Sequence, residues 1–590
     1  MKLTDNALTL LNLRYLRRNE YGEVIETPEQ LFRRVAHAIA IVERKYGKSD
    51  EEIKKIEEEF YELMTSLRFL PNSPTLMNAG TNSGQLSACN VLPLEDSMES
   101  IFETIKNAAI VQKFGGGTGF SFSKLRPKGD KVGSTGGIAA GPVFFLNAFD
   151  SALKGIRQAH RRFATNMGIL RVDHPDIFEF IDAKKQEGVI TTFNISVGIT
   201  DKFMQAVKNN QMFDLVNPRN GKTVMRLPAT EIFDKIAKNA WSNGEPGLVF
   251  IDRMNNTASN PVPHLGPIEA TNPCGEQPLY PYDSCNLGSI DVSKMIKDKE
   301  IDWVLLEKTV KLSVRFLDNV IDSSLFALKE IEERTKSIRR IGLGVMGFAD
   351  MLIKLDIAYN SDQALELAEK LMKFITEKGR EMSVELGEER GSFPEFEKSI
   401  WNGKYKALRN STITTIAPTS NLSIIAGCSH SIEPIFSITY IRNVKDSLGT
   451  NLVETNPLFE EIAKKRGFYS EKLMKQVLAK GKLNGIDQIP DDVKRVFVVS
   501  HDISPEWHVK MQATFQKYTD NAVSKTVNLP NNATVDDVKK IYMLAYDLGC
   551  KGITVYRDGS REKQIINIPK EQDDAEKIIE NSGGCVTCHL

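Results

Sequence analysis

The stretch of sequence with the most chemical potential lies between residues 270 and 288. It carries Asn272, Cys274 and Glu276 at alternate positions, and Cys285 follows nine residues later. A carboxylate close to a thiol suits proton abstraction at one atom of a substrate while the sulfur acts on its neighbour. Because prolines and glycines interrupt this stretch, a regular helix is excluded. We therefore expect a rigid loop inside the core, extended so that the three alternate side chains share one face.

A purely structural role is the alternative for Cys274 and Cys285. Free cysteine is among the residue types most often buried in a core, so an isolated cysteine is more often structural than reactive. The amide, the carboxylate and the two thiols that meet in this segment favour a reactive role.

Two further motifs each have a plain structural interpretation as well. Residues 417–424 follow a strand-like run at 413–416, and their Thr, Ser and Asn side chains could cap a helix whose free amides bind an anion. A structural cap alone is the alternative. The glycine-rich residues 115–119 match neither a Walker loop nor a dinucleotide-binding motif, and by themselves they predict a tight turn.

The chain ends with a pair of cysteines in a polar segment. Beyond Arg561 the sequence becomes polar, and Gly583 and Gly584 precede Cys585 and Cys588. A haem attachment site would need an exported protein, and a zinc site would need a second ligand pair, for example from a partner chain. The glycine hinge and the polar approach favour a mobile dithiol that takes part in exchange. Apart from the zinc alternative, no metal site is predicted.

The apolar pattern predicts the elements that must position these motifs. Thr27, Pro28 and Gln30 form the start of a helix with a capping box, and a second amphipathic helix follows Ser49. Short apolar runs then alternate with helical stretches, which predicts an α/β fold with a largely parallel sheet. The later helices are expected at 100–114, 303–317 and 364–386, and strands at 89–92, 193–197 and 413–416.

The bulk composition excludes several classes of protein. With 76 Lys and Arg against 77 Asp and Glu, the chain has no excess of positive charge for binding nucleic acid or a membrane surface. No apolar run is long enough for a transmembrane helix, and the charged N-terminus does not look like a signal peptide. Seven cysteines are too few for a disulfide scaffold, which indicates a soluble protein of the reducing cytoplasm.

Asn-Pro-Cys-Gly-Glu at 272–276, together with Cys285 and with Ser-Ala-Cys-Asn at 87–90, resembles the active site of the ribonucleotide reductase large chain. The resemblance implies a ten-stranded α/β barrel over residues 85–560, a helical N-terminal region at 1–84 and a flexible tail at 561–590. It implies that Cys274 carries a thiyl radical that abstracts the 3′-hydrogen of a ribonucleotide. Glu276 would take the 3′-hydroxyl proton, and Asn272 would hold the ribose hydroxyls. Cys89 and Cys285 would supply two electrons and end as a disulfide, so their α-carbons must lie within about 7 Å.

The resemblance also implies binding sites. Substrate contacts are expected from the following residues: Ser73, Ala88, Gly117, Pro418, Thr419, Ser420, Asn421 and Leu422. Asp96, Arg126, Arg161 and Arg162 would bind a deoxynucleoside triphosphate effector at the interface of a homodimer, although a solvated basic face is the alternative for 157–162. The family's extra N-terminal ATP-binding domain is not expected, because few residues precede the core.

The resemblance further implies how the radical arises. Gly552-Ile-Thr-Val-Tyr-Arg557 contains one of the two tyrosines that relay a radical from a separate subunit, and arginine stands in the second position. This segment and the short Cys274–Cys285 spacing resemble the adenosylcobalamin-dependent class, although no histidine motif for cobalamin is present. The tail pair, Cys585 and Cys588, would pass electrons from a thioredoxin- or glutaredoxin-like protein. The alternatives are a reductase that needs a radical-generating subunit and a nucleotide sensor that has lost catalysis.

Overall fold

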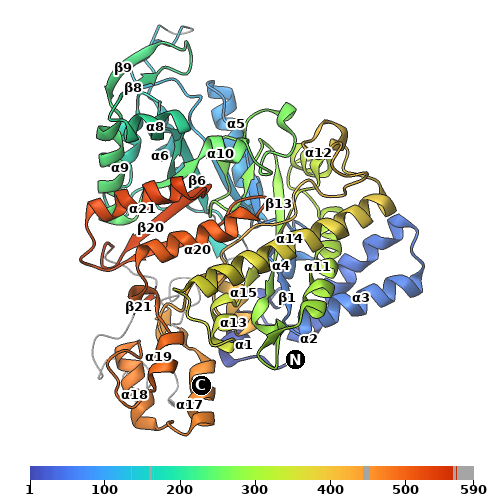
Figure 1. Cartoon of the computed structure of the whole chain (residues 1–590). Helices are drawn as coiled ribbons and strands as arrows, with labels where there is room; N and C mark the ends of the chain where they lie inside the picture. Colours follow the sequence, from blue (N-terminus) through green and yellow to red (C-terminus); the bar gives the residue numbers. More distant parts are fainter. Residues whose placement is uncertain (134–135, 159–161, 164, 443–451, 562–565, 568–590) are drawn as a thin grey trace.

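The structure is a computed structural model that describes residues 1–133, 136–158, 162–163, 165–442, 452–561 and 566–567. A mixed sheet of ten strands lies at its centre (Figure 1). The strands are β1 (Phe69–Pro71), β2 (Cys89–Val91), β3 (Gly117–Ser121), β6 (Asn166–Arg171), β7 (Phe193–Ile199), β10 (Gly247–Phe250), β13 (Ser284–Asp291), β16 (Ile341–Met346), β19 (Thr526–Leu529) and β20 (Gly552–Arg557).

The sheet closes on itself. Its order is β16-β13-β2-β3-β6-β7-β10-β20-β19, with β1 pairing a second part of β13. An extended segment at 412–416 joins the two ends, since Leu343 of β16 pairs with Thr414 and Ile416 pairs with Val523 ahead of β19. The pairs β2–β3–β6–β7–β10 are parallel, and buried side chains cover these strands as expected for a sheet enclosed on both faces. The expected ten-stranded α/β barrel is confirmed.

Helices near the N-terminus pack on one side of this barrel. The helices are α1 (Asp5–Leu10), α2 (Pro28–Ala40), α3 (Asp50–Thr65) and α4 (Ser73–Asn78), with a π-helical turn η1 (Leu11–Tyr15) after α1. The predicted capping box is present, since Thr27 and Gln30 exchange backbone-to-side-chain hydrogen bonds at the start of α2. The apolar faces of α2 and α3 contribute to one hydrophobic core. Strands β13 and β16 and two long helices, α11 (Trp303–Ser323) and α14 (Asp362–Arg390), also contribute side chains to this core.

A second core lies around β6, β7 and β20. It contains apolar residues from α5 (Met98–Lys113), α6 (Pro142–Leu153), α9 (Ala229–Asn243) and α21 (Val535–Asp547). Aromatic side chains fill it, with Phe120 of β3 and Phe122, which directly follows this strand, against Phe149 of α6 at centroid distances of 5.1 and 5.5 Å. The first core packs against β13 and β16, and the second packs against β3, β6, β7, β10 and β20. The strands that carry functional side chains are therefore held by close packing.

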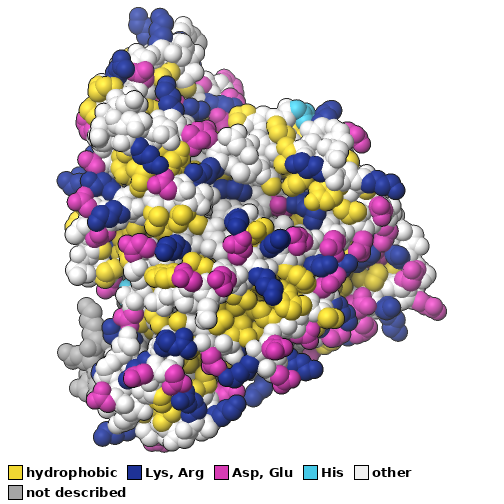
Figure 2. Space-filling model, viewed as in Figure 1, with side chains coloured by type: hydrophobic (Ala, Val, Ile, Leu, Met, Phe, Trp, Pro, Cys, Tyr) yellow, Lys and Arg dark blue, Asp and Glu magenta, His cyan; other side chains and the backbone are white. Residues whose placement is uncertain are grey.

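Three short helices form a separate group at the bottom of Figure 1: α17 (Pro457–Arg466), α18 (Glu471–Lys480) and α19 (Asp491–Val496). A small core that includes Phe459, Leu473 and Phe497 connects them to Ala349 and Ile353 of the rest of the chain. On the face shown in Figure 2, acidic and basic side chains are interspersed, consistent with the balanced composition. Within the described ranges, no helix is both long enough and apolar enough to cross a membrane.

Most elements expected from the sequence are present with shifted ends. The expected helices at 100–114, 303–317 and 364–386 correspond to α5, α11 and α14, and the run at 193–197 lies within β7. The run at 413–416 is extended but makes isolated bridges instead of a regular strand, because its hydrogen bonds alternate between β16 on one side and 522–524 on the other.

Candidate active site

Residues 272–277 form a tight loop between two short strands, β11 (Ala270–Thr271) and β12 (Pro278–Leu279). The Asn272 backbone nitrogen donates to the Gln277 backbone carbonyl at 3.1 Å, and the Gln277 backbone nitrogen donates to the Asn272 side-chain oxygen at 3.0 Å. Gly275 has a left-handed φ of +82°, which favours glycine and reverses the chain. The expected extended segment is therefore wrong, and a turn instead brings Asn272, Cys274 and Glu276 to one cavity.

The glycine-rich residues 115–119 explain how this loop reaches the barrel. Gly117 and Gly119 lie in strand β3, so the prediction of a simple tight turn is wrong for them. A Cβ on Gly119 would lie 1.8 Å from the Thr271 carbonyl oxygen, and one on Gly117 would lie 2.8 Å from the Pro273 ring. Glycine is needed here because the backbone of the cysteine loop packs directly on the strand.

Cys89 and Cys285 lie opposite each other on neighbouring strands. Antiparallel strands β2 and β13 pair Cys285 with Cys89, although 195 residues separate them in the sequence. Residues directly opposite in such a pair have α-carbons about 4.5–5.5 Å apart, which is the range of disulfides. Both cysteines are reduced and buried. The geometric requirement of the proposed redox pair is therefore met.

Cys89 is buried beside polar side chains. The Asn272 side-chain amide donates to its sulfur at 3.1 Å, and its thiol lies 4.0 Å from a carboxylate oxygen of Glu276. Burial, together with the negative charge of Glu276, raises the pKa of Cys89 well above its ordinary value. Burial also raises the pKa of Cys285. Both thiols therefore keep their protons at neutral pH and are available as proton donors.

A cavity of about 290 Å³ unites most of the expected substrate residues. Cys89, Asn272, Cys274 and Glu276 line it. Cys285 is fully buried and is not part of this lining, and its thiol donates to the Asn286 carbonyl 3.3 Å away. The remaining expected contacts also line this cavity: Ser73, Ala88, Gly117, Pro418, Thr419, Ser420, Asn421 and Leu422.

The residues expected to bind phosphate surround the start of a short helix, α15 (Ser420–Ala426). Thr419 precedes it but its side chain does not cap it, so the structural-cap alternative is wrong for this residue. Instead, the Thr419 hydroxyl oxygen accepts from the Ser431 nitrogen at 2.8 Å. This hydrogen bond ties the 418–422 loop to Ser431, and residues 418–422 form part of the cavity wall.

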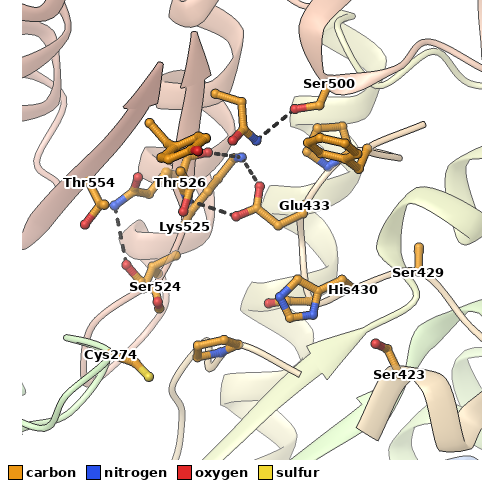
Figure 3. A pocket seen from close by; sticks show the side chains of 18 of the residues that line it. Cys274, Ser423, Ser429, His430, Glu433, Ser500, Ser524, Lys525, Thr526 and Thr554 are labelled. Carbon is orange, nitrogen blue, oxygen red and sulfur yellow. Dashed lines mark hydrogen bonds and ion pairs between the residues drawn. The ribbon is translucent and has the colours of Figure 1, made fainter. Parts of the chain in front are cut away.

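A larger cavity of about 720 Å³ adjoins the first, and Cys274 lines both. Strands β7, β10 and β20, the loop 427–437 and residues 523–528 form its walls. Figure 3 shows the Cys274 thiol at one side of this cavity and Glu433 on another wall. The carboxylate of Glu433 accepts from the Thr526 nitrogen at 2.9 Å and pairs with the buried ammonium group of Lys525. Cys274 is exposed, unlike Cys89 and Cys285.

The Lys525–Glu433 pair was not expected from the sequence. Lys525 also contacts the His508 ring nitrogen Nδ1 at 3.0 Å, and burial lowers the pKa of both side chains. The three residues are separated by 17 to 92 positions and belong to no local motif, so no signal in a single sequence marks them.

The expected effector residues are only partly described. The Arg126 side chain donates to the Asp96 carboxylate at 2.7 Å, and the Arg126 nitrogen donates to the same group at 3.1 Å. Arg162 lies in the short strand β5 (Arg162–Phe163), where its backbone alone is described. Arg161 and the tail cysteines, Cys585 and Cys588, lie outside the described residues.

Comparisons with known proteins agree with this geometry. Residues 1–84 match the model "Ribonucleotide reductase, all-alpha domain", and residues 87–556 match "Ribonucleotide reductase, barrel domain". A relative from Thermoplasma acidophilum named vitamin B12-dependent ribonucleoside-diphosphate reductase is 50% identical over 621 aligned positions, covering 96% of this chain and 80% of the relative. One of the same name from Mycobacterium tuberculosis is 47% identical over 588 positions, covering 99% and 84%.

A solved structure shares the fold. The class Id ribonucleotide reductase alpha subunit of Actinobacillus ureae superimposes with a TM-score of 0.77 at 24% identity, covering 94% of this chain and 97% of that one. The matching family models span almost the whole chain, including the cysteine loop and both strands of the cysteine pair. The chain therefore belongs to the ribonucleotide reductase family.

Proposed function

We propose that this chain reduces ribonucleoside diphosphates to deoxyribonucleotides by a cysteine thiyl-radical mechanism that uses adenosylcobalamin. One observation carries the proposal: Cys274 is an exposed thiol placed between a small cavity lined by Cys89 and Glu276 and a larger cavity on its other side. A residue in this position can be activated from one cavity and react in the other. The names of the relatives from T. acidophilum and M. tuberculosis support the substrate and the cofactor.

The residues of the small cavity have complementary roles. Cys274, as a thiyl radical, takes the 3′-hydrogen, and Glu276 takes the proton of the 3′-hydroxyl group. Cys89 keeps its proton until the 2′-hydroxyl leaves as water, because burial and Glu276 raise the pKa of its thiol. Cys89 and Cys285 then supply two electrons and form a disulfide, while the 3′-hydrogen returns from Cys274. The sum is ribonucleotide plus dithiol giving deoxyribonucleotide, disulfide and water.

The larger cavity fits a bulky cofactor with many polar amides. Its apolar wall includes Ile195, Leu248 and Phe436, and its polar wall includes Asn456 and Glu433. A corrin ring needs apolar contacts over its faces and hydrogen-bond partners for its amide side chains, and both are present here. Adenosylcobalamin, when bound, supplies the organic radical that activates Cys274. The chain itself positions that thiol where it lines both cavities.

The 418–422 loop and Ser73 would bind the substrate phosphates. Backbone amides and hydroxyl groups in a loop ahead of a helix are suited to anions, and these residues line the same cavity as the reactive thiols. The phosphate end and the ribose end of a nucleotide would then lie in a single site.

Effector control would operate at a homodimer interface. Asp96 and Arg126 lie beside the start of α5, where Met98 and Phe102, and also Phe144 of α6, are each more than half exposed. Exposed apolar side chains on neighbouring helices are typical of a surface covered by a partner. A second copy of the chain on this surface would enclose a deoxynucleoside triphosphate against Asp96 and Arg126.

The tail would return the electrons. Cys585 and Cys588 would enter the barrel, reduce the Cys89–Cys285 disulfide by exchange and be reduced in turn by a thioredoxin-like protein. A tethered dithiol suits this role because tethering raises its effective concentration at a buried disulfide.

The deciding experiment supplies the purified chain alone with adenosylcobalamin, a small dithiol and each ribonucleoside diphosphate. Formation of deoxyribonucleotides is expected. A requirement for a second, radical-generating protein would support the alternative in which the radical enters through Tyr556. Arg557 occupies the position of the second relay tyrosine. It stacks on the Trp241 ring at 4.3 Å and donates to the Trp241 carbonyl, which gives it a structural role in place of a radical relay.

A further inference from the structure

The small cavity contains one positively charged side chain whose role no motif suggested. Of the described residues that line it, Arg14 is the one Lys or Arg. The other ionisable side chains of this lining are the thiols of Cys89 and Cys274 and the carboxyl group of Glu276. A substrate that carries phosphate brings negative charge into this space, so the position of Arg14 matters for which ligands bind.

Arg14 is placed by an unusual turn of helix. Helix α1 continues directly into the π-helical turn η1, which is closed by a 3.0 Å hydrogen bond from the Leu16 nitrogen to the Leu11 carbonyl. A π turn contains an extra residue and so changes the direction of the side chains on it, and such turns are frequent at functional sites. Leu11 and Tyr15 enter the core, while Arg14 remains half-buried at the cavity.

The same turn is tied to both segments proposed to bind phosphate. The Tyr15 hydroxyl and the Ser73 hydroxyl are hydrogen-bonded at 2.7 Å, and η1 packs against α4, which starts at Ser73. Helix α1 packs against α15, whose first residues line the cavity. The backbone that carries Arg14 is therefore fixed relative to Ser73 and to residues 418–422 at once.

We propose that Arg14 binds a phosphate group of the substrate and is a residue by which the site selects phosphorylated ribonucleotides. This inference rests on the proposed function of the small cavity as the ribonucleotide site. The planar guanidinium group presents paired donors that match phosphate oxygens, and such charge-assisted bonds are stronger than neutral ones. Because Arg14 is half-buried, solvent and salt weaken its attraction less than that of an exposed cation.

The test compares binding of cytidine diphosphate and of cytidine to the full chain by calorimetry. Arg14→Gln is expected to weaken cytidine diphosphate binding about 10- to 100-fold, the range for a charged hydrogen bond, and to leave cytidine binding unchanged. Arg14→Lys should recover part of the loss, because charge remains but the paired donors do not. Arg17→Gln, which removes an exposed cation from the same segment, is the matched control and should bind both ligands like the wild type.

Two outcomes would overturn the inference specifically. Unchanged diphosphate binding in Arg14→Gln would show that Arg14 does not contact phosphate. An equal loss for cytidine and its diphosphate, with Arg14→Lys no better than Arg14→Gln, would show that Arg14 only supports the cavity. If the wild-type chain binds no ribonucleotide at all, the proposed function fails and the inference fails with it. The thermal midpoint of each variant shows whether it folds.

Discussion

Gly119 provides a sharp test of how the cysteine loop is held. In Gly119→Ala the new methyl group would lie 1.8 Å from the Thr271 carbonyl oxygen, whereas such contacts are essentially never closer than 3.0 Å. The two atoms must therefore move apart by more than 1 Å. Thr271 meets the new methyl group with a backbone atom, and Gly119 lies within β3, so no flexible side chain can absorb the change. The loop that begins at Asn272 must shift away from the barrel.

The shift has separate consequences for stability and for catalysis. Overpacking of this kind costs about 1–3 kcal/mol, which is less than the free energy of unfolding of about 5–15 kcal/mol that is typical of native proteins. A displacement of about 1 Å at reacting groups costs on the order of 100-fold in rate, because Asn272 would leave its 3.1 Å contact with the Cys89 sulfur. We therefore expect a folded variant whose turnover at saturating substrate falls about 100-fold.

The assay is deoxyribonucleotide formation with adenosylcobalamin and a small dithiol, alongside thermal unfolding. Gly155→Ala is the matched control, because no atom lies within 4 Å of the added methyl group. Its turnover should equal that of the wild type. A Gly119→Ala variant that keeps full turnover and the wild-type thermal midpoint would refute the close packing between β3 and the cysteine loop.

Three further predictions address effectors, the tail and pH. Asp96→Ala or Arg126→Ala should weaken the response of substrate choice to deoxynucleoside triphosphates while basal reduction persists, and an unchanged response in both would remove this site. Replacing Cys585 and Cys588 with serine should abolish cycling with thioredoxin but leave one turnover and cycling with a small dithiol; loss of the first turnover would favour a structural zinc site instead. Burial raises the pKa of Asp291 to about 6, so the free energy of unfolding falls as the pH rises through this value and the buried carboxyl group ionises. Asp291→Asn should raise the free energy of unfolding by up to about 3 kcal/mol at pH 7 and by almost nothing below pH 4. A difference in thermal midpoint between variant and wild type that stays constant across this pH range would contradict the prediction.

The sequence predicts local features of this fold well because their causes are local. The capping box of Thr27 and Gln30 starts α2 where expected. The apolar periodicity of α11 follows from its packing on β13 and β16, and that of α14 from its packing on α11. The type of each site residue is also readable, since the thiols and the carboxylate are concentrated near residue 274.

The remaining features depend on contacts between distant segments. The glycines at 115–119 are visible in the sequence. The sequence does not show that the Thr271 backbone lies so close to Gly119 that a methyl group there has no space. Arg14 lies in an ordinary amphipathic pattern, and its direction depends on a π turn that no propensity predicts. The Lys525–Glu433 pair likewise exists only because residues 433 and 525 meet at one cavity wall.

The central claim is that Cys274 is the residue that reacts with substrate, and a single substitution tests it most directly. In Cys274→Ser, deoxyribonucleotide formation with adenosylcobalamin and a dithiol should fall to background, because a hydroxyl group does not form the radical readily. Nucleotide binding should persist, since the side chain keeps its shape. Cys550→Ala, at a cysteine buried in the second core, should retain turnover. Substantial turnover by Cys274→Ser would contradict the account.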